Sequence, residues 1–112
     1  MPVLRRSIRD FALFLIGRRI RFVVAGNSMI PTLKPHESIF INTKYYTYTQ
    51  PKQGDIVLVK HPQKDLLMVK RIAWVDNTSI FIVGDNLSQS TDSRHFGVIQ
   101  SAQLIGKISS KL

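Results

Sequence analysis

Short runs of aliphatic, β-branched and aromatic residues, separated by turn residues, cover most of the chain after residue 18. Runs of this length are typical of β-strands, and turns at intervals of roughly 8–12 residues are typical of β barrels. The pattern therefore predicts a mainly β fold, a compact antiparallel or mixed β barrel. The predicted strands are residues 19–24, 38–42, 55–60, 66–75, 79–83 and 104–108.

The first 18 residues have a different pattern and are expected to form a separate basic and apolar segment. We expect a helix over residues 3–18, with Ser7 or Asp10 near its start. The apolar stretch within it, residues 11–16, is far shorter than the roughly 20 residues of a spanning helix. It is also shorter than the roughly 7–15 apolar residues of a secretory signal. We expect this helix to pack on the body of the domain, with peripheral contact to an anionic membrane as the alternative.

The composition limits the chemistry that the chain can use. Sixteen Lys and Arg against seven Asp and Glu give a net charge of +9, which favours an anionic surface such as nucleic acid, lipid headgroups or an acidic partner. Cysteine is absent, which excludes disulfides and a thiol nucleophile. The three histidines lack metal-site spacing, so neither a metal nor another cofactor is expected.

Ser28 and Lys70 are the candidate catalytic residues. Ser28 follows a predicted strand, Gly26 permits an unusual backbone angle before it, and Pro31 fixes the turn after it. Lys70 lies in the middle of an apolar row on one face of the strand predicted over 66–75. Burial there would lower the pKa of the amine and allow it to accept the serine proton. The row consists of Leu66, Met68, Ile72 and Trp74.

Each candidate also has an ordinary structural explanation. The Lys70 stem could lie on the core with its amine in water, and the Ser28 hydroxyl could cap a helical turn. A Ser-His-Asp triad is a further alternative, although no pattern ties a histidine to Ser28. The candidate histidines are His36, His61 and His95.

The polar segment 84–97 is expected to be a long loop, and so is the tyrosine-rich segment 43–53. Long ordered loops in compact domains often carry function, whereas the alternative is a solvated cluster of turns. In a functional loop, Ser90 would orient the Lys70 amine by a hydrogen bond, and Asp92 and Arg94 would form an ion pair that holds the loop.

Four motifs in order resemble those of type I signal peptidases. They are residues 28–33 (SMIPTL), 54–57 (GDIV), 68–72 (MVKRI) and 84–94 (GDNLSQSTDSR). The resemblance implies the β-rich catalytic core of that family over residues 19–112, with a Ser/Lys dyad. It assigns Ser28 as the nucleophile and Lys70 as the general base, and it implies supporting roles for Asn27, Met29, Pro31, Ser90, Asp92 and Arg94.

The family often carries a second oxyanion donor on a hydroxyl residue two positions before the nucleophile, where this chain has Gly26. The second donor is therefore expected to be a backbone group, Asn27 or water.

The chain lacks the membrane spans and large accessory domain common in the family, and in this it is similar to the nickel-type superoxide dismutase maturation proteases. That resemblance implies a precursor partner, nickel superoxide dismutase with a short N-terminal extension. It also implies a cytoplasmic location, with a peripheral position at the membrane as the alternative.

Three other functions are alternatives for a chain with this sequence. The first is a membrane-associated signal peptidase I that cleaves secretory precursors. The second is a basic β-barrel module that stacks nucleic-acid bases on Tyr45, Tyr46 and Tyr48. Nucleic acid is not the expected partner, because this function leaves Lys70 and the 84–94 loop unexplained. The third, a self-cleaving repressor, is disfavoured because no helix-turn-helix precedes the domain.

Overall fold

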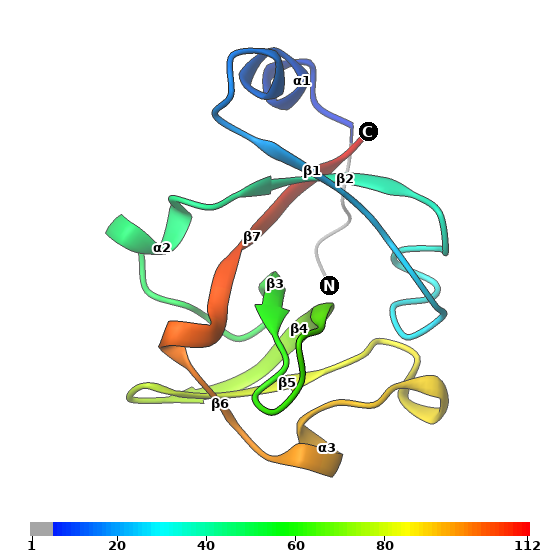
Figure 1. Ribbon diagram of the computed structural model, residues 1–112, viewed down its shortest axis with the longest axis vertical. Helices are drawn as coiled ribbons and strands as arrows, with labels where there is room; N and C mark the ends of the chain where they lie inside the picture. The colour runs from blue at the N-terminus through cyan, green and yellow to red at the C-terminus, as the bar shows by residue number, and fades with distance from the viewer. Residues whose placement is uncertain (1–5) are drawn as a thin grey trace.

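One seven-stranded antiparallel sheet carries the fold of residues 6–112, the part of the chain that the computed structural model describes (Figure 1). The order of strands across the sheet is β1-β2-β7-β3-β4-β5-β6. The strands are β1 (Ile20–Val23), β2 (Ser38–Asn42), β3 (Ile56–Lys60), β4 (Leu67–Asp76), β5 (Ser79–Val83), β6 (Ile99–Gln100) and β7 (Leu104–Lys111). The mainly β prediction is confirmed, and the sheet is curled.

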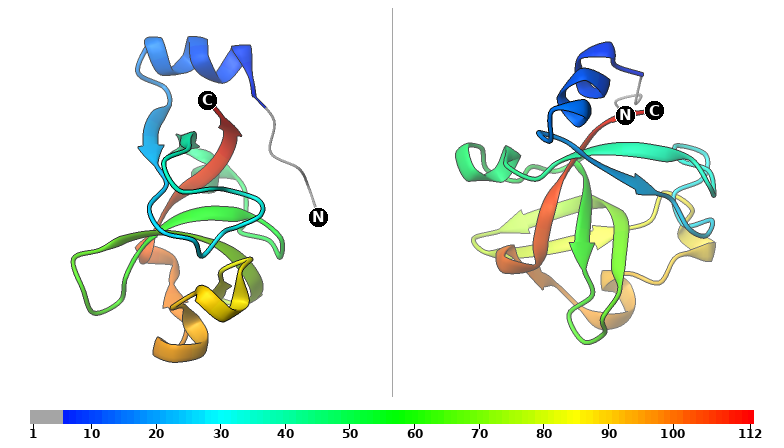
Figure 2. Two further views of the ribbon diagram at one scale, coloured as in Figure 1. Left: turned by 90° about the vertical axis from the view of Figure 1, so that its right-hand side faces the viewer. Right: turned by 45° about the horizontal axis from the view of Figure 1, so that its top comes forward.

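The strand β7 joins the two halves of the curled sheet, since it pairs with β2 along one edge and with β3 along the other. The register shifts between Phe40 and Ile41 in the first pairing and between Leu58 and Val59 in the second. Such bulges increase local twist and bend the strands. Figures 1 and 2 show the resulting crossing of the β1–β2 layer over the β3–β6 layer.

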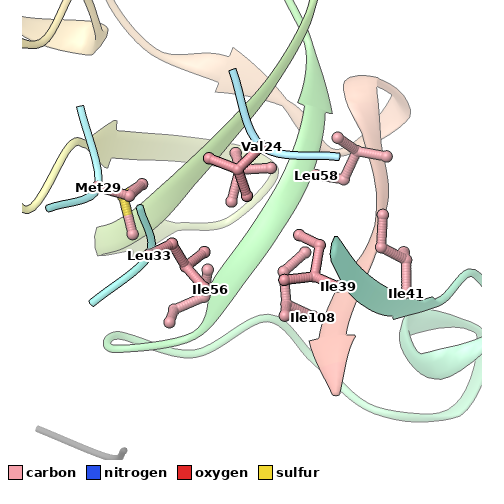
Figure 3. Packing of buried hydrophobic residues seen from close by; sticks show 9 residues of the cluster. Val24, Met29, Leu33, Ile39, Ile41, Ile56, Leu58 and Ile108 are labelled. Carbon is pink, nitrogen blue, oxygen red and sulfur yellow. The ribbon is translucent and has the colours of Figure 1, made fainter. Parts of the chain in front are cut away.

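Both faces of β3 are buried because the sheet curls around this strand. Alternate residues of β3 point to opposite faces, so Ile56 and Leu58 enter one core cluster while Val57 and Val59 enter the other. The first cluster, which Figure 3 shows, consists of Val24, Met29, Leu33, Ile39, Ile41, Ile56, Leu58, Val69 and Ile108. The turn after β1 is therefore anchored in the core through Met29 and Leu33.

Helix α1 (Ile8–Leu15) packs on this sheet and is shorter than the predicted helix over 3–18, of which residues 3–5 lie outside the described part. Ser7 caps it by accepting a hydrogen bond from the Asp10 N–H at 3.0 Å. Phe14 packs on Phe40, with ring centroids 5.4 Å apart. In residues 6–112 there is no helix with the length and apolar character that crossing a membrane requires.

The two predicted loops contain short helices. Residues 43–53 include α2 (Tyr45–Tyr48), and residues 84–97 include η1 (Leu87–Gln89) and α3 (Ser93–Phe96). The two-residue strand β6 and the turn η2 (Ser101–Gln103) follow. These elements are too short to produce a clear hydrophobic period in the sequence.

Candidate active site

Lys70 lies in the middle of β4 and is only 4% exposed. Its neighbours on the same face, Met68 and Ile72, are buried as predicted. The prediction that Leu66 and Trp74 complete this apolar row is wrong, because they are 49% and 45% exposed. Leu66 precedes the strand, and a shift of register between Ile72 and Trp74 breaks the alternation.

The amine of Lys70 meets the 84–97 segment through a hydroxyl group. Lys70 Nζ donates a hydrogen bond to Ser90 Oγ at 3.0 Å, and the Ser90 hydroxyl donates to Asp92 Oδ2 at 2.6 Å. Asp92 is fully buried and also accepts from Arg94 Nε at 2.9 Å and from the Gly84 N–H at 2.9 Å. The structure thus brings together Lys70, Ser90, Asp92 and Arg94.

Burial is the largest cause that lowers the pKa of Lys70. The charge of Asp92 opposes this effect, and the charge of Arg94 adds to it. Burial alone would raise the pKa of Asp92, but hydrogen bonds from Arg94, Ser90 and the Gly84 N–H hold it well below its ordinary value. Asp92 is therefore an anion, and Arg94 rather than Lys70 is its ion-pair partner.

Ser28 lies in the turn after β1 and lines the same small cavity as Lys70, of about 170 Å³. Its carbonyl oxygen accepts a hydrogen bond from the Asn86 N–H at 2.8 Å. In the described part of the chain the Ser28 N–H makes no hydrogen bond. The other residues that line the cavity are Phe22, Val24, Ala25, Met29, Leu66, Leu67, Met68 and Val69.

Gly84 explains how the Ser28 turn and Ser90 come close to each other. It is buried between them, and a β-carbon added to it would overlap Ser90 Oγ and lie 2.5 Å from the Ser28 carbonyl oxygen. Only glycine leaves room for this approach of backbone and side chain. Because Lys70 is hydrogen-bonded to Ser90, the close approach of Ser90 to the Ser28 turn also places the lysine amine beside that turn.

The remaining predicted site residues flank Ser28. Met29 is buried, and its sulfur lies 3.5 Å from the Asp85 N–H. The carbonyl of Asn27 accepts from the Asn86 side chain at 3.1 Å, while its own side chain is exposed. Pro31 is exposed and follows a cis peptide bond. These contacts give Met29 and Asn27 a direct part in holding the turn against the 84–86 segment.

A buried ion pair, which was not predicted from the sequence, links β4 to the 84–97 segment. Arg71 Nε and Nη2 donate to the two oxygens of Asp85 at 2.8 and 2.9 Å, and Arg71 Nη1 donates to the Gly54 carbonyl at 2.8 Å. The hydroxyl of Thr32 also donates to Asp85. A buried arginine needs a carboxylate partner. The position of Arg71 among apolar residues of the predicted strand was therefore a sequence signal for this ion pair.

None of the three histidines lines the cavity that Ser28 and Lys70 share. His61 is buried against Phe96, with ring centroids 4.6 Å apart, and His95 takes part in the cap of α3. His36 is exposed in the turn before β2. Among residues 6–112, no three His, Cys, Asp or Glu side chains gather in a way that could hold a metal ion.

The model of the family "Signal peptidase, peptidase S26" matches residues 11–75 and 73–112 of this chain. Mitochondrial inner membrane protease subunit 1 of Xenopus tropicalis is 25% identical over 107 residues, covering 77% of this chain and 64% of the relative. Signal peptidase I P of Bacillus subtilis subsp. natto is 39% identical over 67 residues, covering 59% and 36%. Mitochondrial ATP-independent inner membrane protease subunit 1a of Arabidopsis thaliana is 32% identical over 108 residues, covering 75% and 64%. The chain spans less than two thirds of the length of each.

Proposed function

Since the chain belongs to the signal peptidase family, peptidase S26, we propose that it is a serine endopeptidase that cleaves a precursor protein. In this proposal Ser28 is the nucleophile and Lys70 is the general base. The observation that carries the proposal is the buried Lys70 amine. It shares a small cavity with Ser28 and donates a hydrogen bond to the neutral hydroxyl of Ser90. A lysine in these surroundings holds its proton weakly and can act as a base.

The reaction is an acyl transfer in two steps. Neutral Lys70 takes the proton of the Ser28 hydroxyl while Ser28 Oγ attacks the scissile carbonyl carbon. The protonated amine then gives that proton to the leaving nitrogen, and the peptide bond breaks to leave an ester on Ser28. Lys70 next takes a proton from water, which attacks the ester, and the proton returns to Ser28 Oγ.

The backbone N–H of Ser28 is proposed as one oxyanion donor, because no other group in the described chain uses it. A single donor of this kind contributes about 2.7–4 kcal/mol to transition-state stabilisation. A hydroxyl side chain at position 26 is absent, and the positive φ of 76° there suits glycine. The side chain of Asn27 is the proposed second donor, with a backbone N–H or water as the alternative.

Two strand edges near the cavity have no partner strand within residues 6–112, which supports binding of the substrate as an extended strand. Strand β1 lies at the edge of the sheet. Strand β4 pairs with β5 only from Arg71 onward, so no strand in the described part of the chain pairs with the second edge of residues 67–70. Both segments contribute side chains to the cavity. A substrate strand laid between them would place its scissile bond over Ser28.

The proposed substrate is a nickel superoxide dismutase precursor with a short N-terminal extension, as the resemblance of the 84–97 segment suggests. The proposed location is the cytoplasm or the periphery of a membrane. The second candidate is a membrane signal peptidase that cleaves secretory precursors, and the names of the relatives from Bacillus subtilis and the mitochondrial inner membrane favour it.

The test is cleavage by the purified protein of two substrates, the superoxide dismutase precursor and a secretory precursor with an Ala-x-Ala site. Mass spectrometry of the new N-terminus identifies the bond cut and decides between the substrates. Ser28→Ala and Lys70→Met should each abolish cleavage, whereas Ser88→Ala, an exposed serine of the same segment, should not. Cleavage retained by a folded Ser28→Ala or Lys70→Met chain rules out the proposed dyad.

A further inference from the structure

Helix α1 presents an apolar stripe to solvent on the side that faces away from the sheet. Ile8 and Leu15 are 92% and 67% exposed, and Phe11 and Ile16 are also exposed. Ile8 and Leu15 are seven residues apart and share one face of the helix. Phe11 lies at the margin of this face, where its ring also contacts Phe40 of β2, with ring centroids 6.3 Å apart. The buried side of the helix instead carries Asp10. Part of the apolar surface of α1 is therefore left outside the protein, although Phe14 packs inward on Phe40.

The inner side of α1 is fixed to the body of the protein, so the apolar stripe cannot simply rotate inward. Asp10 is buried and accepts from the Ser110 hydroxyl at 2.6 Å and from Arg19 Nε at 3.0 Å. The hydrogen bonds lower the pKa of Asp10 although burial raises it, so this side chain is an anion that holds the helix. Phe14 packs on Phe40 from the same side.

Cationic side chains surround this stripe. A groove of about 640 Å³ beside α1 is lined by Arg9, Arg18, Arg19 and Lys44. Of these, only Arg19 has an ion-pair partner within the described residues, namely Asp10. Arg6 lines a second groove on the other side of the helix. An anionic bilayer has phosphates at its surface and acyl chains beneath them. Exposed apolar residues flanked by cations can therefore contact both parts of such a bilayer.

We propose that α1 is a docking element for an anionic phospholipid bilayer. The stripe of Ile8, Leu15 and Ile16, with the exposed part of the Phe11 ring, enters the boundary between headgroups and acyl chains, and Arg9, Arg18 and Lys44 contact the lipid phosphates. The protein then binds a membrane from its surface through this short helix. The inner side of α1 stays on the sheet when the helix binds lipid, because Asp10 and Phe14 keep their present contacts.

Docking in this way leaves the candidate active site away from the bilayer. Figures 1 and 2 place α1 at one end of the long axis of the molecule and α3, which follows Asp92, at the other. The proposal does not depend on the peptidase function, and cleavage of a soluble peptide should be unchanged when α1 is altered.

The test is cosedimentation of the whole protein with vesicles of phosphatidylcholine alone and of phosphatidylcholine mixed with phosphatidylglycerol. Binding is expected only to the anionic vesicles, and it should weaken as salt is added. The double variant Ile8→Ser/Leu15→Ser should lower binding at least about tenfold, because two apolar side chains no longer enter the lipid. Leu87→Ser, an exposed leucine beside α3, is the matched apolar control.

Charge is tested separately, so that the proposal does not rest on one variant. Each arginine near an anionic membrane contributes a factor of about 5 in binding, so Arg9→Gln/Arg18→Gln should weaken it about 30-fold. Lys52→Gln/Lys64→Gln removes the same charge at exposed positions on other loops and should have a much smaller effect. Circular dichroism verifies that each variant is folded.

Equal binding to neutral and anionic vesicles would overturn the proposal, and so would unchanged binding by a folded Ile8→Ser/Leu15→Ser chain. Sedimentation velocity without lipid gives a further outcome. A dimer that these two substitutions disrupt would assign the stripe to a second copy of the chain instead. A loss of precursor cleavage in the absence of lipid would assign it to the protein substrate.

Discussion

Lys70 Nζ and Ser90 Oγ lie 3.0 Å apart inside the protein, and the Ser90 hydroxyl separates the lysine amine from the carboxylate of Asp92. The lysine thus meets a neutral partner, although an anion lies directly behind it. Arg94 forms the ion pair with that anion. The pKa of Lys70 therefore depends on burial and on the opposite charges of Asp92 and Arg94, which lie beyond the Ser90 hydroxyl.

Removal of either charge should shift the pH profile of cleavage, in opposite directions. Burial is the main cause of the lowered pKa of Lys70, which Asp92 raises and Arg94 lowers further. Because the neutral amine is the proposed base, kcat/KM should rise with pH through this pKa. Arg94→Gln should move the rise to higher pH, and Asp92→Asn should move it to lower pH. The measurement is kcat/KM on a peptide substrate across the pH range.

The control for this pair is Lys64→Gln, which changes an exposed charge in the β3–β4 connection. Its profile should match that of the unchanged protein. A shift in the same direction for both Arg94→Gln and Asp92→Asn would show that the two residues act on the fold and not on the lysine.

Ser90→Ala should lower kcat by up to about 100-fold with a smaller change in KM, because the amine loses the partner that orients it. Ser90→Thr keeps the hydroxyl and should recover part of the activity. Ser88→Ala, the exposed serine of the same segment, should leave kcat unchanged. Steady-state kinetics of the three variants distinguish an orienting role from a packing role, in which Ser90→Ala and Ser90→Thr would lose activity equally.

Lys70→Met should stabilise the fold at neutral pH by about 0.5–2 kcal/mol while it abolishes cleavage. Burial lowers the pKa of Lys70 in the folded state below its ordinary value of 10.5. Between these two pKa values the unfolded chain binds more protons, so the free energy of unfolding should rise with pH in this range. Lys70→Met should lack this rise. Urea unfolding at several pH values measures both effects, and a less stable variant with an unchanged slope would contradict them.

Arg71→Met should lower the free energy of unfolding by about 3–5 kcal/mol, because it leaves the carboxylate of Asp85 buried without its cation. Arg71→Met with Asp85→Leu should recover much of this loss, since no unpaired charge then remains. Lys111→Met is the control: its pair with Glu37 is partly exposed and should contribute at most about 1 kcal/mol. Urea unfolding of the four proteins tests this, and equal losses for Arg71→Met and Lys111→Met would refute it.

The strands were predictable because their signals are local. Residues 38–42 and 79–83 are strands with the predicted bounds, since each combines β-branched residues with turn residues at its ends. The burial of Lys70 was predictable from its two nearest neighbours on the same face. Its outer neighbours Leu66 and Trp74 were not, because the bulge after Ile72 and the true start of β4 depend on pairing with other strands.

By itself, the sequence determined the mainly β fold, the short N-terminal helix and the family, because these depend on residue patterns within short segments. The hydrogen bond from Lys70 to Ser90 was expected from the sequence. Only the tertiary structure decided that the Ser90 hydroxyl lies between Lys70 and Asp92, that Arg71 pairs with Asp85, and that Ile8 and Leu15 of α1 face solvent. These relationships join segments that are distant in the chain. They follow from the curl of the sheet, which sets which side chains meet and which remain outside.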